Sequence, residues 1–137
     1  MVYQRIVDGG EKTMQITILG QCPPQKNDKK IAINSRTGKR FPITGAKTKE
    51  WQQSAHVQLT TQYKGQFEGR AGISYMFYVK DNRRRDWDNM VATVNDALVK
   101  AGVLSDDSWQ ACYCAGVDCE MDSDNPRVEL WVTDDSE

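Results

Sequence analysis

The chain has 137 residues, 39% of them hydrophobic and 27% charged, which suits one globular domain with its own core and excludes a disordered chain. No apolar run approaches the roughly 18–20 residues that span a membrane, and without a secretory signal we expect a cytoplasmic protein with reduced cysteines. The net charge of -1 conceals a basic front, with 16 Lys and Arg against 6 acids in residues 1–85, and an acidic back, with 2 against 13 in residues 86–137.

Hydrophobic periodicity predicts strands and helices in a mixed order. Residues 1–12 are polar and are expected to form a loose leader, and residues 14–19 alternate apolar and polar side chains as a strand does. Residues 23–49 are dense in Lys, Arg and turn-forming residues and are expected to form one long loop. Helices are then predicted over 47–63 and 88–101, and strands over 71–80, 109–117 and 127–133. This order predicts a single α+β domain over residues 1–137, in which two main helices pack on a mixed β-sheet.

The basic front half concentrates its charge in the long loop and just ahead of the second helix. Lys and Arg bind the phosphate backbone of nucleic acid through charge, and Phe41 is the only aromatic residue that the loop offers for base stacking. A solvated surface is the ordinary alternative for any basic run. The candidate DNA-binding residues are Lys26, Lys29, Lys30, Arg36, Lys39, Arg40, Arg83, Arg84 and Arg85.

The acidic half opens with two pairs of carboxylates that flank the second predicted helix. Asp86 and Asp88 fall at period 2 in chain expected to be extended, so their side chains should point the same way, and Asp106-Asp107 follow the helix. Such pairs repel unless a divalent cation lies between them, and Mg²⁺ prefers hard oxygen ligands of this kind. A helix that returns beside its own start would bring both pairs together. Helix capping and ordinary turn residues are the alternatives for either pair alone.

These acids belong to a longer string with fixed spacing. The string is Asp86-x-Asp88-Asn89-x6-Asp96-Ala97-Leu98-x3-Gly102-x3-Asp106-Asp107. It resembles the signature of RusA-type Holliday-junction resolvases, which are small endonucleases often found in phages and prophages. Residues 23–27 (Pro-Pro-Gln-Lys-Asn) resemble the N-terminal loop of that family, and residues 125–130 resemble its last turn and strand. The resemblance covers about residues 14–133.

The resemblance implies a RusA-like fold and a Mg²⁺-dependent, structure-selective endodeoxyribonuclease that acts as a homodimer on four-way DNA junctions. Carried over by position, Asp86, Asp88 and Asp107 would be the catalytic metal ligands, with Asp106 beside them in support. The reaction would be phosphodiester hydrolysis by metal-activated water. Mn²⁺ shares the preference for carboxylate and water and is the alternative metal.

One position departs from the family pattern. The family usually carries a Lys one helical turn after the Asp-x-Asp-Asn motif, and this chain has Ala92 there. Arg84 or Arg85, next to Asp86, is expected to supply the missing charge at the scissile phosphate. The main alternative is a catalytically weak or inactive junction-binding protein of the same fold.

Two further features of the acidic half bear on the predicted nuclease function. Cys112, Cys114 and Cys119 leave a structural zinc site as a weaker alternative, because their spacing differs from paired zinc knuckles and the fourth ligand would be Cys22 or a carboxylate. The acidic residues 118–124, together with the acidic tail Asp134, Asp135 and Glu137, would repel DNA, so we expect them on a surface that faces away from the junction.

Overall fold

The computed structural model describes residues 4–8, 11–24 and 29–134 of the chain. These residues form two helices and seven strands. In chain order the elements are β1 (Gln4–Asp8), β2 (Glu11–Leu19), β3 (Lys29–Ile33), β4 (Arg40–Thr44), α1 (Ala46–Gln62), β5 (Ala71–Val79), α2 (Trp87–Lys100), β6 (Cys112–Met121) and β7 (Arg127–Asp134).

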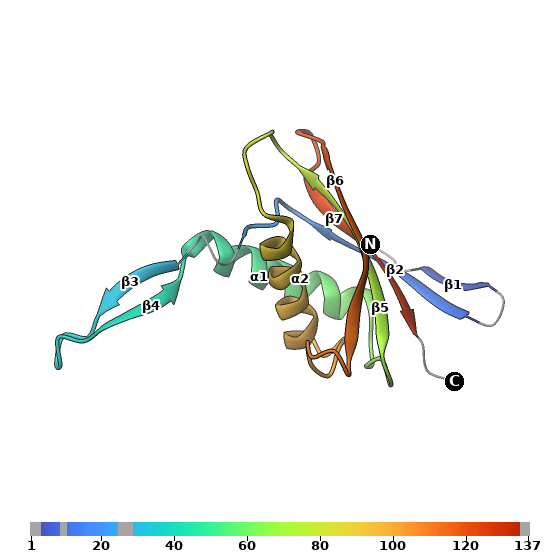
Figure 1. Cartoon of the computed structure of the whole chain (residues 1–137), viewed down its shortest axis with the longest axis horizontal. Helices are drawn as coiled ribbons and strands as arrows, with labels where there is room; N and C mark the ends of the chain where they lie inside the picture. Colours follow the sequence, from blue (N-terminus) through green and yellow to red (C-terminus); the bar gives the residue numbers. More distant parts are fainter. Residues whose placement is uncertain (1–3, 9–10, 25–28, 135–137) are drawn as a thin grey trace.

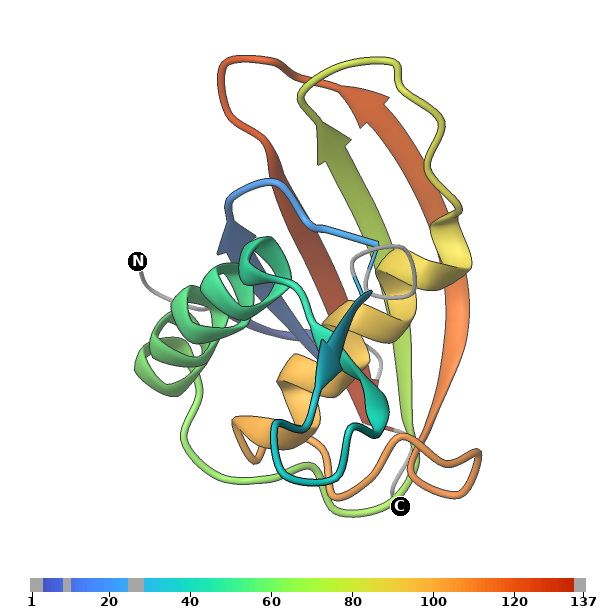
Figure 2. The same cartoon turned by 90° about the vertical axis from the view of Figure 1, so that its left-hand side faces the viewer.

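Five strands form one mixed sheet in the order β1-β2-β7-β5-β6. All neighbours run antiparallel except β5 and β6, which are parallel because α2 carries the chain back to the starting end of β5 before β6 begins. Both helices lie against one face of this sheet (Figure 1, Figure 2). The structure thus confirms the expected α+β domain with two helices on a mixed sheet.

The core lies between the sheet and the helices, and alternation along the strands fills it from one side. Ile16 and Ile18 of β2, Phe77 of β5 and Leu130 of β7 are almost fully buried. Burying a side chain of this size contributes roughly 1.5–3 kcal/mol, so this layer supplies much of the folding free energy. The helices close the core with Trp51, Ala55 and Leu59 of α1 and with Met90, Val94 and Leu98 of α2.

The strand bounds differ from the sequence prediction at both edges of the sheet. Residues 1–12 were expected to form a loose leader, but β1 lies within them and pairs antiparallel with β2. Ile6 and Val7 are β-branched residues that favour strands, and β2 offers its free edge as a partner. At the other edge, β6 begins at Cys112 because a tight turn, closed by hydrogen bonds to the Ser108 carbonyl, holds the preceding residues out of the sheet.

The segment expected to be one long loop contains a hairpin instead. β3 and β4 pair antiparallel and project away from the body of the molecule as an arm, residues 29–44 (Figure 1). Asn34 closes the turn, since its Oδ1 accepts hydrogen bonds from the backbone N–H of Arg36 and Thr37, and Gly38 follows with φ +71°. Ile31 and Ile33 are 65% and 63% exposed, so the arm buries little of its apolar surface within one chain.

Candidate functional site

The loop between β5 and α2 is held by one arginine. The Arg85 guanidinium, only 11% exposed, donates a hydrogen bond to Asp81 Oδ1 at 2.7 Å and others to the backbone carbonyls of Asp81 and Arg83. This contact holds the pKa of the Asp81 carboxyl below its usual value. Arg85 therefore braces the loop, and its charge is already used within the fold.

The first carboxylate pair lies where this loop enters α2. The helix begins at Trp87, so Asp86 precedes it with an extended backbone, whereas Asp88 lies within its first turn rather than in extended chain as the sequence suggested. The half-exposed Asp86 side chain makes no capping hydrogen bond, and the exposed Asp88 carboxylate accepts one only from the adjacent Asn89 N–H. Both carboxylates are thus accessible, and capping does not explain Asp86.

The second carboxylate pair lies at the opposite end of α2. The Asp106 carbonyl accepts a hydrogen bond from the Cys112 thiol (Sγ···O 4.0 Å) at the start of β6, and Cys112 is paired with Ala71 at the start of β5. Asp86, in contrast, follows the end of β5, and the 14-residue helix between the pairs is about 21 Å long. One chain therefore does not bring Asp106 and Asp107 to Asp86 and Asp88.

The donor set suits a divalent cation in chemistry but is divided in space. Carboxylate oxygens are the ligands that Mg²⁺ prefers, and all four acids are accessible. Within the described part of the chain, however, no three His, Cys, Asp or Glu side chains lie close enough together to hold a metal ion. Each end of α2 offers half of the expected ligand set.

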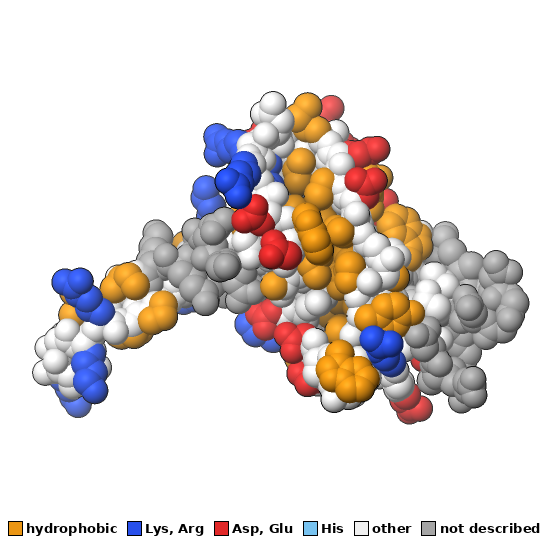
Figure 3. All heavy atoms as spheres, in the orientation of Figure 1, with side chains coloured by type: hydrophobic (Ala, Val, Ile, Leu, Met, Phe, Trp, Pro, Cys, Tyr) orange, Lys and Arg blue, Asp and Glu red, His pale blue; other side chains and the backbone are white. Residues whose placement is uncertain are grey.

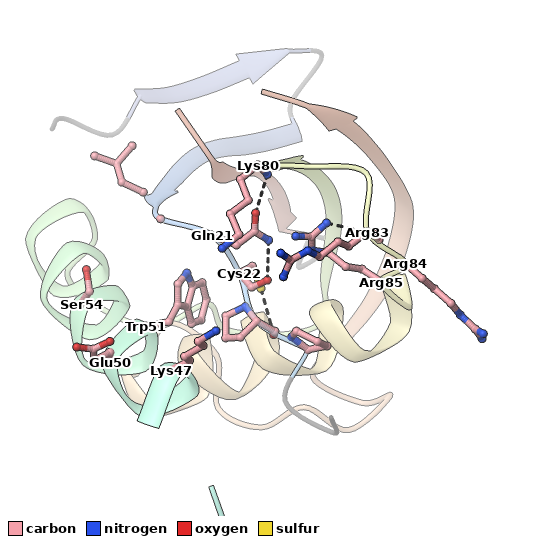
Figure 4. A pocket seen from close by; sticks show the side chains of 14 residues that line it. Gln21, Cys22, Lys47, Glu50, Trp51, Ser54, Lys80, Arg83, Arg84 and Arg85 are labelled. Atoms are coloured by element: carbon pink, nitrogen blue, oxygen red, sulfur yellow. Dashed lines mark hydrogen bonds between the residues drawn. The ribbon is translucent and has the colours of Figure 1, made fainter. Parts of the chain in front are cut away.

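The two arginines expected to replace the family lysine differ in their surroundings. Arg84 is 91% exposed, and its Nε lies 3.6 Å from Asp86 Oδ1. In Figure 4 its side chain points away from the residues around the neighbouring pocket. Ala92 is exposed on α2, so a cation is not excluded there by packing. Arg84 is therefore the charge available beside the first carboxylate pair.

Asp96, the remaining acid of the motif, has a structural role. Its Oδ2 accepts a hydrogen bond from Gln52 Nε2 of α1 at 2.9 Å and pairs with Lys100 at 3.1 Å. These contacts join the two helices. Asp96 is thus the motif acid that serves packing rather than ligand binding.

The Pro-Pro segment packs on the same half of α2 as the first carboxylate pair. Thr93 Oγ1 donates a hydrogen bond to the Pro23 carbonyl at 2.8 Å, and the buried Cys22 thiol points to the Met90 carbonyl at 3.7 Å. Burial raises the pKa of this thiol well above its ordinary value, so Cys22 stays protonated. Two segments that are far apart in sequence, and that carried the family resemblance together, are thus neighbours in the fold.

The candidate DNA-binding residues fall in two regions. Arg36, Lys39 and Arg40 are exposed on the arm, and Lys29 and Lys30 belong to its first strand. Arg83 to Arg85 lie in the β5–α2 loop. Figure 3 shows Lys and Arg gathered on the arm and again at the end of the sheet that carries this loop. Lys26 lies outside the described residues.

The acidic residues 118–124 do not lie where we expected. The Asp122 N–H donates a hydrogen bond to the Val79 carbonyl, so the β6–β7 turn lies at the same end of the sheet as the β5–α2 loop. Arg127 offsets part of this charge by ion pairs with Asp122 at 2.9 Å and Glu129 at 3.2 Å. It keeps the pKa of the Asp122 carboxyl low. Arg127 thus gives Asp122 a structural role, and the turn shares this end of the sheet with the basic loop. Asp135 and Glu137 of the acidic tail lie outside the described residues.

The cysteines do not favour the zinc alternative. Cys22 and Cys112 are buried, whereas Cys114 and Cys119 are exposed, and all four thiols are free. In the residues for which side chains are described, they form no cluster with each other or with acids that could hold a metal ion.

Comparison with known proteins identifies the family to which the chain belongs. A search among curated proteins finds no match to the chain. Within the described ranges, no helix is long and apolar enough to cross a membrane. The family model described as Endodeoxyribonuclease RusA matches residues 21–133. That family comprises endonucleases of Holliday junctions. The match spans the Pro-Pro segment, the arm, both carboxylate pairs and β7, and the chain therefore belongs to the RusA endodeoxyribonuclease family.

Proposed function

We propose that this protein is a Mg²⁺-dependent endonuclease that cleaves four-way DNA junctions as a homodimer. One observation carries the proposal: Asp86 and Asp88 present accessible carboxylates at the start of α2, unused by capping, beside the exposed Arg84 guanidinium. Two metal ligands and a cation for the phosphate are thus combined where the β5–α2 loop enters α2.

The division of the acids between the two ends of α2 supports the homodimer. One chain offers two carboxylates at each end, and a helix of about 21 Å cannot bring them together. A two-fold symmetric pair of chains can place Asp107 of one chain against Asp86 and Asp88 of the other, and symmetry then makes two identical sites. Two sites match a substrate in which two strands are cut.

The chain's own residues would prepare the strand for attack. Mg²⁺ held by the carboxylates would activate water and stabilise charge on the leaving oxygen. Arg84 would contact the phosphate beside Asp86, and the arm would bind the backbone of the junction arms through Arg36, Lys39 and Arg40. Arg85 would keep the loop in place through Asp81.

A second candidate function follows from Ala92. The position that usually carries a lysine in the family is an exposed alanine on α2, so the positive charge of that lysine is absent there. A protein of this kind would bind junctions through its basic surfaces and cut them slowly or not at all.

The test is junction cleavage with matched variants. A labelled four-way junction is incubated with the protein in Mg²⁺, in Mn²⁺ and in EDTA, and Asp88→Asn is compared with Asp96→Asn, whose carboxylate joins the helices. We expect symmetric nicks that need metal, are lost in Asp88→Asn and persist in Asp96→Asn. A gel shift without nicks would establish the second candidate. Neither nicks nor a shift would refute both.

A further inference from the structure

A pocket lies beside the proposed catalytic end of α2, and nothing in the metal chemistry uses it. It is formed by three segments: the turn after β2, the first turns of α1 and the β5–α2 loop (Figure 4). Its volume is about 530 Å³, within the range of small-molecule sites. Arg83, Arg84 and Arg85 line one side of it, and Lys47 and Trp51 of α1 line the other.

The pocket carries an excess of positive charge. Five residues with cationic side chains line it, of which Arg84 points away (Figure 4), and Glu50 is the single acid among the lining residues. Arg85 is committed to Asp81, and Arg83 shares that carboxylate at a longer distance of 3.5 Å. Lys47 and Lys80 make no ion pair with any described residue, so their charge is free for an anion.

The rest of the lining is apolar, with one buried donor. Leu19, Pro23 and Pro24 contribute apolar surface, and Trp51, 6% exposed, lies in the wall. Its indole N–H is the one buried side-chain polar group, among those the structure describes, that has no hydrogen-bond partner. The ring edge faces the turn at Gly20, where an added Cβ would lie 3.6 Å from Cδ1. An unpartnered buried donor costs free energy, so this wall of the pocket holds a polar group that the fold leaves unsatisfied.

A cationic rim over an apolar wall matches a nucleotide better than it matches a bare anion, because a nucleotide combines a charged phosphate with an apolar face. In a duplex the bases are stacked inside and cannot reach such a wall, whereas a nucleotide that has left the stack can. Leaving the stack costs least where stacking is already interrupted, and at the exchange point of an open four-way junction the paired helices end without a stacked continuation.

We propose that this pocket binds one nucleotide that leaves the stack at the exchange point of the junction, with its phosphate against Lys47, Lys80 and Arg83 and its base against the Pro23-Pro24 and Trp51 wall. This inference rests on the proposed junction-cleaving function and adds how the substrate is recognised. Asp86 follows Arg83 by three residues, a span of at most about 10 Å. A nucleotide in the pocket would thus belong to the strand that passes the carboxylates, and its capture would select branched DNA over a continuous duplex.

Nuclear magnetic resonance of the full-length protein tests the proposal. The indole N–H signal of Trp51, assigned through Trp51→Phe, is followed during titration with the single-stranded trinucleotide d(TTT), with a blunt DNA duplex and with inorganic phosphate. We expect a saturable shift with d(TTT) that is at least about tenfold weaker with phosphate and absent with the duplex. An equal response to phosphate, or a response to the duplex, would overturn the nucleotide assignment.

The matched variants are the double substitution Lys47→Gln/Lys80→Gln and the control Lys49→Gln, which removes a charge from α1 outside this pocket. The double variant should weaken d(TTT) binding at least about tenfold while the folded spectrum is preserved, and the control should not. If junctions are bound and cut but the Trp51 signal does not respond, the pocket proposal fails and the proposed function stands. If junctions are neither bound nor cut, the proposed function fails first.

Discussion

The two ends of α2 carry the same pair of carboxylates in different surroundings. At the start, Asp86 and Asp88 lie beside Arg84 and a cationic pocket. At the far end, the nearby cation Arg70 is already engaged: its Nε donates to the Trp109 carbonyl at 2.7 Å, and its guanidinium lies 4.4 Å from the centre of the Tyr113 ring. The cation beside the first carboxylate pair is therefore exposed, whereas the one beside the second pair is held by contacts within the fold.

This difference indicates what each end contributes. The starting end combines carboxylates with an exposed arginine and a cationic pocket, whereas Arg70 at the far end is held against Trp109 and Tyr113. Val94 and Leu98, both fully buried, fix α2 against the sheet, so the helix cannot bend its two ends together. The far end is then best understood as a donor of ligands to a second copy.

The largest expected effect comes from separating the two ends by mutation. Asp88→Asn and Asp107→Asn should each lower junction cleavage at least about a hundredfold, because loss of a metal ligand forfeits several kcal/mol of transition-state stabilisation. Mixed in equal amounts, the two inactive proteins should recover cleavage. A heterodimer has one site in which both defects meet and one site that is intact, so about a quarter of the wild-type sites should work.

The control keeps both defects at one end. A mixture of Asp86→Asn and Asp88→Asn contains a broken carboxylate pair in every site and should stay inactive. The readout is the number of strands cut per junction: recovered activity should give single nicks rather than paired ones. No recovery in the first mixture, under conditions where subunits exchange, would show that each chain closes its own site.

The sequence predicted most helices and strands of the body of the molecule but missed the arm. The stripe Trp51, Ala55, Leu59 identified α1 because its period is helical and its face is buried, and the alternation in β7 identified that strand. The arm was missed because its apolar residues are few and stand among lysines, arginines and turn residues. Its alternation around Ile31 and Ile33 was the available signal.

The site was predicted in composition but not in geometry. Spacing identified the four acids, yet their positions depend on whether β6 pairs parallel or antiparallel with β5. A parallel pair needs α2 to run back along the sheet, which carries Asp106 and Asp107 to the start of β5 and leaves Asp86 at its end. That choice is made by pairing across the whole sheet, which no local pattern encodes.

The second prediction concerns the buried face of α2, the helix that separates the two carboxylate pairs. Leu98→Ala removes a fully buried side chain and should lower the free energy of unfolding by about 2–5 kcal/mol. Ile33→Ala on the arm removes an exposed one and should change it by less than about 0.5 kcal/mol. Urea denaturation measures both. Equal losses would mean that the arm is packed in solution and that α2 is not the principal support.

The third prediction compares neighbours at the starting end. Arg84→Met should lower the cleavage rate about tenfold with an unchanged melting temperature, because Arg84 is exposed and faces Asp86. Arg85→Met should lower the melting temperature, because it breaks the brace on Asp81. Cleavage rates and melting curves of both variants decide. If Arg85→Met alone slows cleavage of the folded protein, the charge beside the phosphate has been assigned to the wrong residue.

The smallest expected effect is the pH dependence of that brace. Because Arg85 lowers the pKa of Asp81 in the folded protein, the ion pair adds stability at any pH above the ordinary aspartate value of 3.8 and loses it as pH falls through the lower folded value. The melting-temperature difference between wild type and Asp81→Asn should be constant from pH 7 to pH 5 and shrink below about pH 4. Both groups are near the surface, so added salt should reduce it as well. A melting-temperature difference that is equal at pH 7 and pH 3 would mean that Asp81 holds the loop by hydrogen bonds alone. The loop at the start of α2 would then keep its shape without the charge of the Asp81–Arg85 ion pair.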